Sequence, residues 1–210
     1  MRPRPGLHCE VCRREGLAAG RDRRGIGMLE FLVALAVFAT AAVALQGAQL
    51  AGKRLQHDAL QRSRAVALAR DMLVHIQASG VDASRYEVTN AGDPLRPAAP
   101  VTADCARIAC TAQQLAAYDL WQWQRALAGA GERRAQEWAG GLLRPRACIV
   151  VHAGVATVTI NWRSMAPGGD SGAAGCAGNV AGIYDAPDWA PGNRRHLREV
   201  SVSAYVGAAP

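Results

Sequence analysis

The sequence lacks the short motifs that mark the common classes of enzyme. No Gly-x-Gly-x-x-Gly follows a predicted strand, and no Gly-Lys-Ser or Gly-Lys-Thr phosphate loop occurs in the 210 residues. Beyond His8, the histidines are scattered along the chain without Ser-His-Asp or metal-ligand spacing: His57, His75, His152 and His196. We therefore expect no catalytic residues, no metal site and no cofactor, and the chain is predicted not to be an enzyme.

Proline is absent from residues 26–79, so nothing in the sequence interrupts a helix over that stretch, and Gly80 is a typical helix stop. Such a helix would extend about 80 Å at 1.5 Å a residue. Within residues 31–45 only Thr40 is polar, whereas the second half carries one amphipathic stripe. The stripe consists of Leu55, Ala59, Val66, Ala69, Leu73 and Ile76. We expect the first half to lie in a membrane or filament core, and the second half to pack on a head domain formed by the rest of the chain.

A single carboxylate, Glu30, stands at the beginning of the apolar run. An ionised Asp, Lys or Arg at the centre of a bilayer costs about 2.5–3.5 kcal/mol on insertion scales, and we expect Glu to be similar. Glu30 therefore needs a partner and a purpose. A cleaved secretory signal and a plain single-span anchor are the alternatives, since residues 26–45 cover the roughly 20 residues that a span requires. Neither alternative has a use for Glu30.

The residues before Glu30 resemble the leader of type IV prepilins: Arg23 and Arg24, then Gly25, then four apolar or small residues. In that family a peptidase cuts after the glycine and methylates the new N-terminus. The resemblance implies cleavage between Gly25 and Ile26, N-methylation of Ile26, and a role for Glu30 in assembly. Ile26 departs from the family, whose first mature residue is usually Phe. The implied fold class is α+β and pilin-like: a long N-terminal α-helix, membrane-spanning in its first half, packed on a small antiparallel β-sheet head domain.

Helix and strand patterns follow in the head. Thr111 with Gln114 three residues later is a capping-box signature, which predicts a helix over residues 113–128 that Gly129 ends. Its predicted apolar side consists of Leu115, Leu120, Trp123 and Leu127. We expect its aromatic residues to lie in the core, with an exposed partner-binding Trp as the alternative. Residues 90–100 are predicted to form a loop.

A short apolar run predicts a strand at residues 147–152. Period-two alternation predicts half-buried strands of an antiparallel sheet at residues 155–162 and 199–206. Ala153 and Gly154 can turn the chain between the first two strands. The stretch 164–196, rich in Gly and Pro, is predicted to be a long loop.

The head also resembles the minor pilins called PilV, or type IV pilus modification protein. Their Asp-Leu-x-x-Trp-x-x-x-Leu segment is matched by Asp119, Leu120, Trp123 and Leu127. A Cys pair stands before the helix and Gly140-Gly141 after it. The strand at residues 158–162 reads Val-Thr-Ile-Asn-Trp, with Ile160 in place of the second Val of those proteins.

The six cysteines fall into two groups: Cys9 and Cys12 near the start, and Cys105, Cys110, Cys148 and Cys176 in the head. One Cys-x-x-Cys at residues 9–12 is a weak metal signal, and the head has none, which argues against zinc. An even set in an exported head predicts two disulfides, for which three pairings are possible. We favour Cys105 with Cys110 and Cys148 with Cys176, because neither pair needs a long-range match. The second pair would tether the long loop.

The predicted organisation is a cleaved leader at residues 1–25, a helix at residues 26–80 (26–50 in the membrane or filament core, 51–80 amphipathic), and a periplasmic head at residues 81–210 with a disulfide-tethered loop at 163–197. The leader holds seven arginines against three carboxylates, which is +4 of the net charge of +7. These arginines favour a cytoplasmic N-terminus. The remaining +3 argues against nucleic acid as a partner of the mature chain.

The resemblance implies a minor pilin, a structural protein of type IV pilus initiation and assembly that is held in the inner membrane before it enters the pilus. Its implied partners are the prepilin peptidase, other minor pilins, the major pilin and inner-membrane lipid. A minor pseudopilin of a type II secretion system is the alternative, because it shares the leader and the shape. A membrane-anchored periplasmic enzyme would need a catalytic set that the sequence does not show. A DNA-uptake pilin would use the small basic patch Arg194, Arg195 and Arg198, which is more often a solvated surface.

Overall fold

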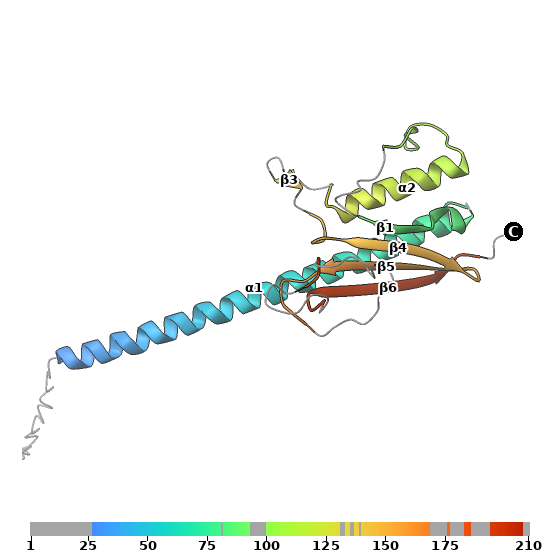
Figure 1. The fold of residues 1–210 in the computed structure, drawn as a ribbon. Coiled ribbons are helices and arrows are strands. Elements are labelled where there is room, and N and C mark those ends of the chain that lie inside the picture. The colour runs from blue at the N-terminus through green and yellow to red at the C-terminus, as the bar shows by residue number, and fades with distance from the viewer. Residues whose placement is uncertain are drawn as a thin grey trace, which may run out of the picture. The chain divides into compact units, whose positions relative to one another are not determined.

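The computed structural model describes residues 27–80, 82–92, 100–130, 133–134, 137–138, 140–168, 176, 183–185 and 194–207. The chain divides into two compact units, Met1–Gln46 and Gly47–Pro210, and each is considered by itself. The elements are α1 (Met28–Ala78), the 3-10 helix η1 (Ala83–Tyr86), β1 (Val88–Ala91), α2 (Ala112–Leu127), β2 (Arg133–Arg134), β3 (Glu137–Trp138), β4 (Arg146–His152), β5 (Val155–Arg163) and β6 (Leu197–Tyr205) (Figure 1). The predicted α+β class is confirmed.

The helix α1 is uninterrupted, as the absence of proline predicts. It ends at Ala78, where the backbone N–H of Ser79 donates to the carbonyl of His75 at 3.0 Å. Gly80 follows with φ 62°, the left-handed conformation that glycine adopts at little cost after a helix. The predicted stop is therefore confirmed.

Four strands form one antiparallel sheet in the order β1-β4-β5-β6 (Figure 1). β4 and β5 make a hairpin in which His152 pairs with Val155. The turn residues Ala153 and Gly154 have φ 50° and 77°. Two consecutive positive φ angles are what a type I′ turn requires, and its twist matches that of the flanking strands. The three predicted strands and their turn are thus present, each within about two residues of the predicted bounds.

The sequence patterns do not predict η1 or β1, and the loop expected at residues 90–100 is wrong at its start, because Asn90 and Ala91 belong to β1. β1 has only four residues, and a register shift interrupts its pairing with β4. So short and irregular a strand shows no period in the sequence. Its position depends on β4, and the backbone N–H of Val151 there donates to the Glu87 carboxylate at 3.0 Å.

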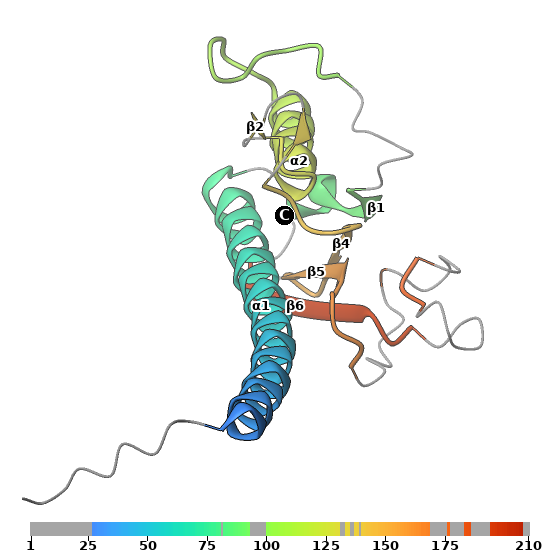
Figure 2. The ribbon, with the colours of Figure 1, turned by 90° about the vertical axis from the view of Figure 1, so that its left-hand side faces the viewer.

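The core of the second unit lies on one face of the sheet (Figure 2). Alternate residues of β5 point into it, as predicted, and are almost fully buried: Ala156, Val158, Ile160 and Trp162. Two helices cover this face. They contribute Ala65, Ala69, Met72, Leu73 and Ile76 from α1, and Ala116, Trp123 and Leu127 from α2.

The stripe predicted on α1 is correct in its last turns and wrong before them. Ala69, Leu73 and Ile76 are buried, but Leu55 is 65% exposed and Ala59 is exposed as well. Val66, also assigned to the stripe, is half-buried, and Ala65 lies in the core instead. The buried residues of α1 begin only at Gln61, and both Leu55 and Ala59 come before it.

A polar clamp, formed by Asp58, Gln61 and Arg64, fastens α1 to two head loops. The amide nitrogen of Gln61, a residue only 7% exposed, donates to the carbonyl of Gly141 at 3.2 Å, and its amide oxygen accepts from the N–H of Leu143 at 3.0 Å. Arg64 donates to the carbonyl of Gly140. The two carboxylate oxygens of Asp58 accept from the backbone N–H groups of residues 165 and 166, at 2.8 and 3.2 Å. The pattern of apolar residues does not reveal these polar positions, although they mark where the contacts between the head and the helix begin.

The helix α2 begins with the predicted capping box. The Thr111 hydroxyl accepts from the backbone N–H of Gln114, and the Gln114 side chain accepts from the N–H of Thr111. Trp123 is buried, and its indole N–H donates to the carbonyl of Leu68 on α1 at 3.0 Å. The predicted core position of Trp123 is confirmed, whereas Leu120 on the same predicted side is only half-buried.

A buried pair of polar side chains joins η1 to α2. The Tyr86 hydroxyl donates to the Asp119 carboxylate at 2.8 Å, and both residues are buried. Burial, together with the adjacent Asp119 carboxylate, raises the pKa of Tyr86 to about 12. The hydrogen bond satisfies two groups that would otherwise be costly to bury.

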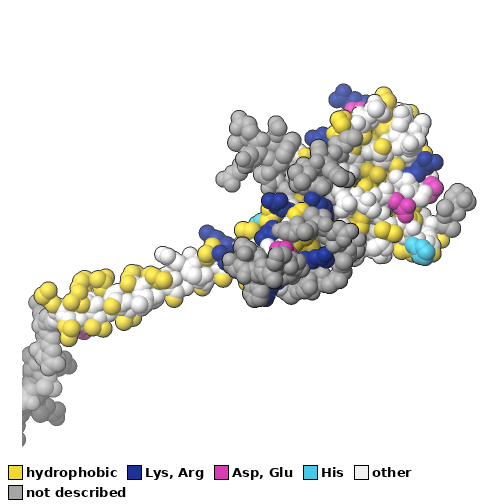
Figure 3. All heavy atoms as spheres, viewed as in Figure 1, with side chains coloured by type: hydrophobic (Ala, Val, Ile, Leu, Met, Phe, Trp, Pro, Cys, Tyr) yellow, Lys and Arg dark blue, Asp and Glu magenta, His cyan; other side chains and the backbone are white. Residues whose placement is uncertain are grey.

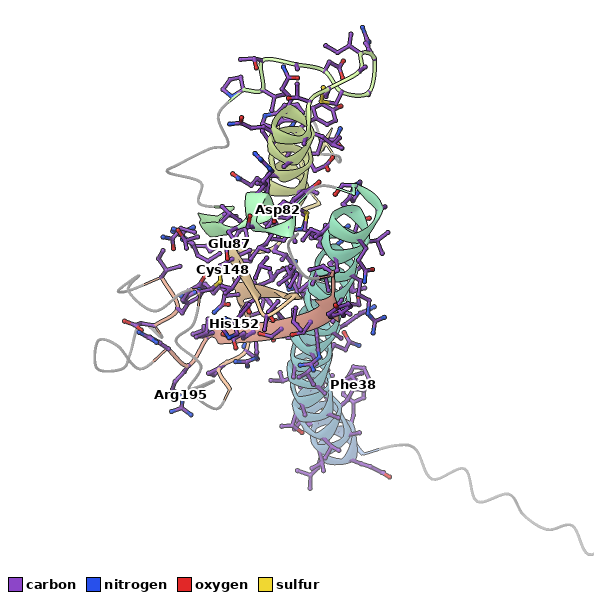
Figure 4. The ribbon with its side chains drawn as sticks, turned by 90° about the vertical axis from the view of Figure 1, so that its right-hand side faces the viewer. Phe38, Asp82, Glu87, Cys148, His152 and Arg195 are labelled. Carbon is purple, nitrogen blue, oxygen red and sulfur yellow. A yellow bond between two sulfur atoms is a disulfide. The ribbon has the colours of Figure 1, made fainter. Side chains whose placement is uncertain are left out.

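The structure pairs the four head cysteines as Cys105–Cys110 and Cys148–Cys176, with Cα atoms 5.5 and 5.6 Å apart. These separations are typical of disulfides. Cys148 lies opposite Thr159 on the outer face of the sheet (Figure 4), and the sulfur of Cys176 is 3.5 Å from the Thr159 carbonyl oxygen. The second disulfide therefore ties residue 176 to the outer face of the two central strands.

We predict that Asp119→Ala lowers the free energy of unfolding by about 1–3 kcal/mol, because it leaves the Tyr86 hydroxyl buried without its acceptor. Tyr86→Phe introduced into that variant should cost little more. Chemical denaturation of the detergent-solubilised full chain measures both. Asp71→Ala is the matched control, since the Asp71 side chain is 64% exposed, and it should change stability by less than about 0.5 kcal/mol.

The same pair should make the stability of the protein depend on pH in the alkaline range. The pKa of Tyr86 is raised from 10.0 to about 12, so above pH 10 the unfolded chain loses this proton while the folded chain keeps it. Stability should therefore fall as the pH rises from about 10 to 12, and Tyr86→Phe should lose less over that range. Equal losses in the two proteins would contradict the role assigned to this hydroxyl.

A second prediction concerns the disulfides. By loop-closure entropy, Cys148→Ser should cost about 3–4 kcal/mol of stability, because its bridge spans 28 residues. Cys105→Ser is the comparison, and it should cost about 2 kcal/mol because that bridge spans only 5 residues. Non-reducing peptide mapping of the full chain, purified without reductant, should recover both bridges. A Cys110–Cys148 link, or free thiols in the head, would refute the pairing.

Candidate functional site

The part of α1 in the first unit is apolar and almost entirely exposed. Residues 28–41 are all exposed, and Phe38, which Figure 4 labels on the helix, is 72% exposed. Apolar side chains occur along the whole face of this segment that Figure 3 shows. Among the described residues, α1 is the one helix whose length and composition would let it cross a membrane. An apolar surface this large is characteristic of a membrane-contacting or protein-contacting surface.

Glu30 lies in the first turn of this apolar helix and is exposed. It is the only charged side chain between Arg24 and Lys53. Its place in the first turn is electrostatically favourable, because the helix dipole stabilises a negative charge there. In the part of the chain that the structure describes, no cation forms an ion pair with Glu30. A carboxylate in this setting requires a positive partner from elsewhere before it can be buried.

Thr40, the polar residue within residues 31–45, needs no hydrogen-bond partner from outside the helix. The Thr40 hydroxyl donates to the carbonyl of Val37 at 2.9 Å, within the helix itself. Hydroxyls bonded in this way can enter an apolar environment without an unsatisfied donor. Of the two polar side chains in residues 28–41, Glu30 is therefore the one that still requires a partner before it can enter an apolar environment.

Gly25 and Ile26, the predicted cleavage and methylation positions, lie outside the described residues, as do Cys9 and Cys12. The nearest described position is Gly27, whose carbonyl accepts the first helical hydrogen bond, from the N–H of Phe31 at 3.1 Å. The helix therefore begins within two residues of the predicted mature N-terminus.

The head brings no catalytic constellation together among its described residues. His75 Nδ1 lies 3.9 Å from Asp119, beyond hydrogen-bond distance, and the other oxygen of that carboxylate is held by Tyr86. His196 Nδ1 is 2.8 Å from the carbonyl oxygen of Ser164, which is a structural contact. No group of three or more His, Cys, Asp or Glu in the described ranges could hold a metal ion.

The basic patch at residues 194–198 differs from the predicted solvated surface. The Arg198 guanidinium is half-buried and donates to the carbonyls of Leu197, Ala166 and Arg195, at 2.8, 3.0 and 3.3 Å. Arg198 thus holds the loop that follows β5. A guanidinium committed to backbone carbonyls in this way is poorly placed to contact phosphates.

One surface feature was missed by the sequence patterns. A cavity of about 590 Å³ lies between α2 and residues 100–103, and Trp121 lines it. The available signal was a second periodic face of α2, formed by Gln113, Ala117, Trp121 and Gln124, on a helix whose other face already fills the core.

Comparison with known proteins gives one match. Residues 45–121 match the family model Tt1218-like, described as type IV pilin Tt1218. The matched stretch contains the second half of α1, η1, β1 and the beginning of α2. No curated protein and no solved structure matches the chain.

The match is independent of the leader and of Glu30, because it begins at residue 45. It agrees with the observed architecture, a long N-terminal apolar helix and a small antiparallel four-stranded sheet. The fold is pilin-like, and the family match supports a type IV pilin.

Proposed function

We propose that this chain is a minor pilin of the PilV type, a structural and non-enzymatic protein that takes part in the initiation and assembly of type IV pili. The observation that carries the proposal is the exposed apolar helix with one carboxylate in its first turn. The family match supports the pilin class, and the segment around Asp119 and Trp123 supports the narrower assignment.

The exposed helix needs two successive environments. Residues 26–50 would span the inner membrane, since about 20 residues at 1.5 Å each cross the hydrocarbon core. In a filament, the same surface would pack against the apolar helices of neighbouring subunits. One surface can serve both environments, because lipid and packed helices are similarly apolar.

Glu30 would act in the transfer between them. Cleavage after Gly25 gives Ile26 a positively charged amine at the edge of the apolar layer, and N-methylation leaves that charge in place. Opposite charges about 4 Å apart attract by roughly 4 kcal/mol at an effective dielectric of 20, before the cost of desolvation. Burying either charge alone is unfavourable, so the pair sets the register in which a neighbouring subunit's Glu30 docks on the new amine.

The organisation of the chain follows from the same proposal. Residues 1–25 form the cytoplasmic leader that the prepilin peptidase removes, residues 26–80 form the helix, and residues 81–210 form the periplasmic head. The oxidising periplasm suits the two disulfides. The partners are inner-membrane lipid before assembly, and other minor pilins and the major pilin after it.

A minor pseudopilin of a type II secretion system remains the alternative, because it would share the leader and the helix. The Trp-containing helix α2 and the disulfides of the head favour the pilus. A membrane-anchored periplasmic enzyme has no support from the described residues, in which no catalytic set is assembled.

We predict that the mature protein begins at Ile26. The peptidase must accommodate a residue without a side chain at the cut, so Gly25→Asp should leave the full-length precursor in the membrane. Intact-mass and N-terminal peptide analysis of the membrane fraction measures this. A mature N-terminus at Ala42 or Leu45 would instead indicate a secretory signal.

We predict that Glu30→Ala protein is cleaved and reaches the membrane but is missing from filaments. The carboxylate is needed only when the helix leaves lipid for its neighbours. Glu30→Asp should be partly impaired, because its shorter side chain changes the reach to the amine. Immunoblots of membrane and sheared-filament fractions give both readouts. Normal amounts of Glu30→Ala protein in the filaments would show that this carboxylate has no part in assembly.

A further inference from the structure

The cavity beside α2 is separate from the apolar helix and from every contact invoked for assembly. It lies between one face of α2 and residues 100–103, and its volume of about 590 Å³ is typical of small-molecule sites. The residues that matter for its chemistry are Thr102, Gln113, Leu120, Trp121 and Gln124. One wall is a helix that is anchored on its other face, and the second wall adjoins a turn closed by a disulfide.

The wall formed by residues 100–103 leads directly into the first disulfide. Ala103 is buried, and the Asp104 carbonyl accepts from the N–H groups of Arg107 and Ile108 at 2.9 and 3.1 Å. The Cys105–Cys110 bridge closes this turn immediately before α2. The end of this wall that joins the turn is therefore constrained, which lowers the cost of ordering it around a ligand.

The opposite wall is the second face of α2. The first face is anchored, since Asp119 binds Tyr86 and the Trp123 indole bonds to the carbonyl of Leu68. The second face carries Gln113 and Gln124 about three turns apart, with Trp121 between them. Side chains on an anchored helix are held more accurately than those on a loop.

The orientation of Trp121 is restrained by two neighbouring side chains of α2. The guanidinium carbon of Arg125 lies 4.6 Å from the indole ring centroid, and the Tyr118 ring centroid lies 6.0 Å away with the rings tilted by 33°. Stacking by a cation and contact with a second ring restrict rotation of the indole. A half-buried tryptophan held in this way, and not used in the core, presents an apolar surface to the cavity.

The cavity selects against charged ligands. Among the described residues that line it, none carries a charge. A phosphate or carboxylate would lack a cationic partner, and an ammonium group would lack an anionic one. The polar groups free of the capping box are the amides of Gln113 and Gln124 and the hydroxyl of Thr102, each of which both donates and accepts. The Thr111 hydroxyl also lines the cavity, but it accepts from the backbone N–H of Gln114. Gln114 contributes less, because its side-chain oxygen is used in the capping box.

Amides and a hydroxyl around an aromatic ring are well suited to binding a neutral sugar. A neutral sugar ring has hydroxyls that donate and accept around its rim, and an apolar C–H face that packs on an indole. The geometry points to a binding site for a neutral saccharide in this cavity, with Trp121 as the stacking platform and Gln113, Gln124 and Thr102 as hydroxyl partners. This site would give the head a surface-recognition function in addition to assembly.

The test is saturation-transfer difference NMR on the detergent-solubilised full chain, with lactose, maltotriose and N,N′-diacetylchitobiose as neutral probes and sialyllactose as the charged one. We expect transfer to at least one neutral sugar, and at least about tenfold weaker binding in Trp121→Ala. Trp121→Phe should keep most of the affinity, since a ring remains, and Gln124→Ala should weaken binding severalfold. Gln122→Ala is the matched control, because Gln122 is exposed and does not line the cavity.

Three results would overturn the proposal. One is no transfer to any neutral probe, and another is transfer that Trp121→Ala leaves unchanged while its melting temperature equals that of the wild type. The third is loss of in vivo cross-linking to another pilin in Trp121→Ala without sugar binding by the wild type, which would make the cavity a protein-docking surface. The sugar-binding and melting readouts use purified protein and do not depend on filament formation, so failure here is distinct from failure of the assembly role.

Discussion

The constraint on which the account depends is the burial of an apolar helix that its own unit leaves uncovered. Residues 28–41 are fully apolar apart from Glu30 and Thr40, and all are exposed. Water is a poor environment for such a surface, and each fully buried Leu, Val or Phe side chain gains about 1.5–3 kcal/mol. Lipid or other subunits must therefore cover it. Glu30 then limits where this segment can be buried. Its charge is tolerable in an apolar layer only when a positive group pairs with it.

In the second unit, by contrast, one side of α1 packs against the head. The contacts between α1 and the head begin with the polar clamp at Asp58, Gln61 and Arg64 and continue with the buried residues up to Ile76. The clamp binds backbone groups of loops, whereas the apolar contacts bind the sheet. Helix α2 adds a second layer through the Trp123 indole and the Tyr86–Asp119 pair. The head is therefore tied to α1 by directional bonds as well as by apolar burial, which favours one arrangement of its parts.

The sequence predicted the elements whose periods are long and regular. α1, α2 with its capping box, and the three long strands appear as expected, because each buries one face and repeats that pattern over several turns or residues. η1 and β1 were not predictable, because four residues carry no period and β1 takes its place from β4. Leu55 and Ala59 were assigned wrongly because a stripe shows that a face is apolar, not where its partner begins. Among the candidate site residues, Glu30 was identifiable from its isolation. The cavity at Trp121 depends on the position of residues 100–103, which belong to no periodic segment.

The most direct test of the central claim is deletion of the gene, with surface pili and exoprotein secretion scored in the same strain. A minor pilin used in pilus initiation should leave few or no surface pili and normal secretion, and the intact gene should restore the pili. Normal pili together with lost secretion would contradict the account and identify a pseudopilin. Normal pili with normal secretion would contradict it as well, because neither filament would then need this subunit.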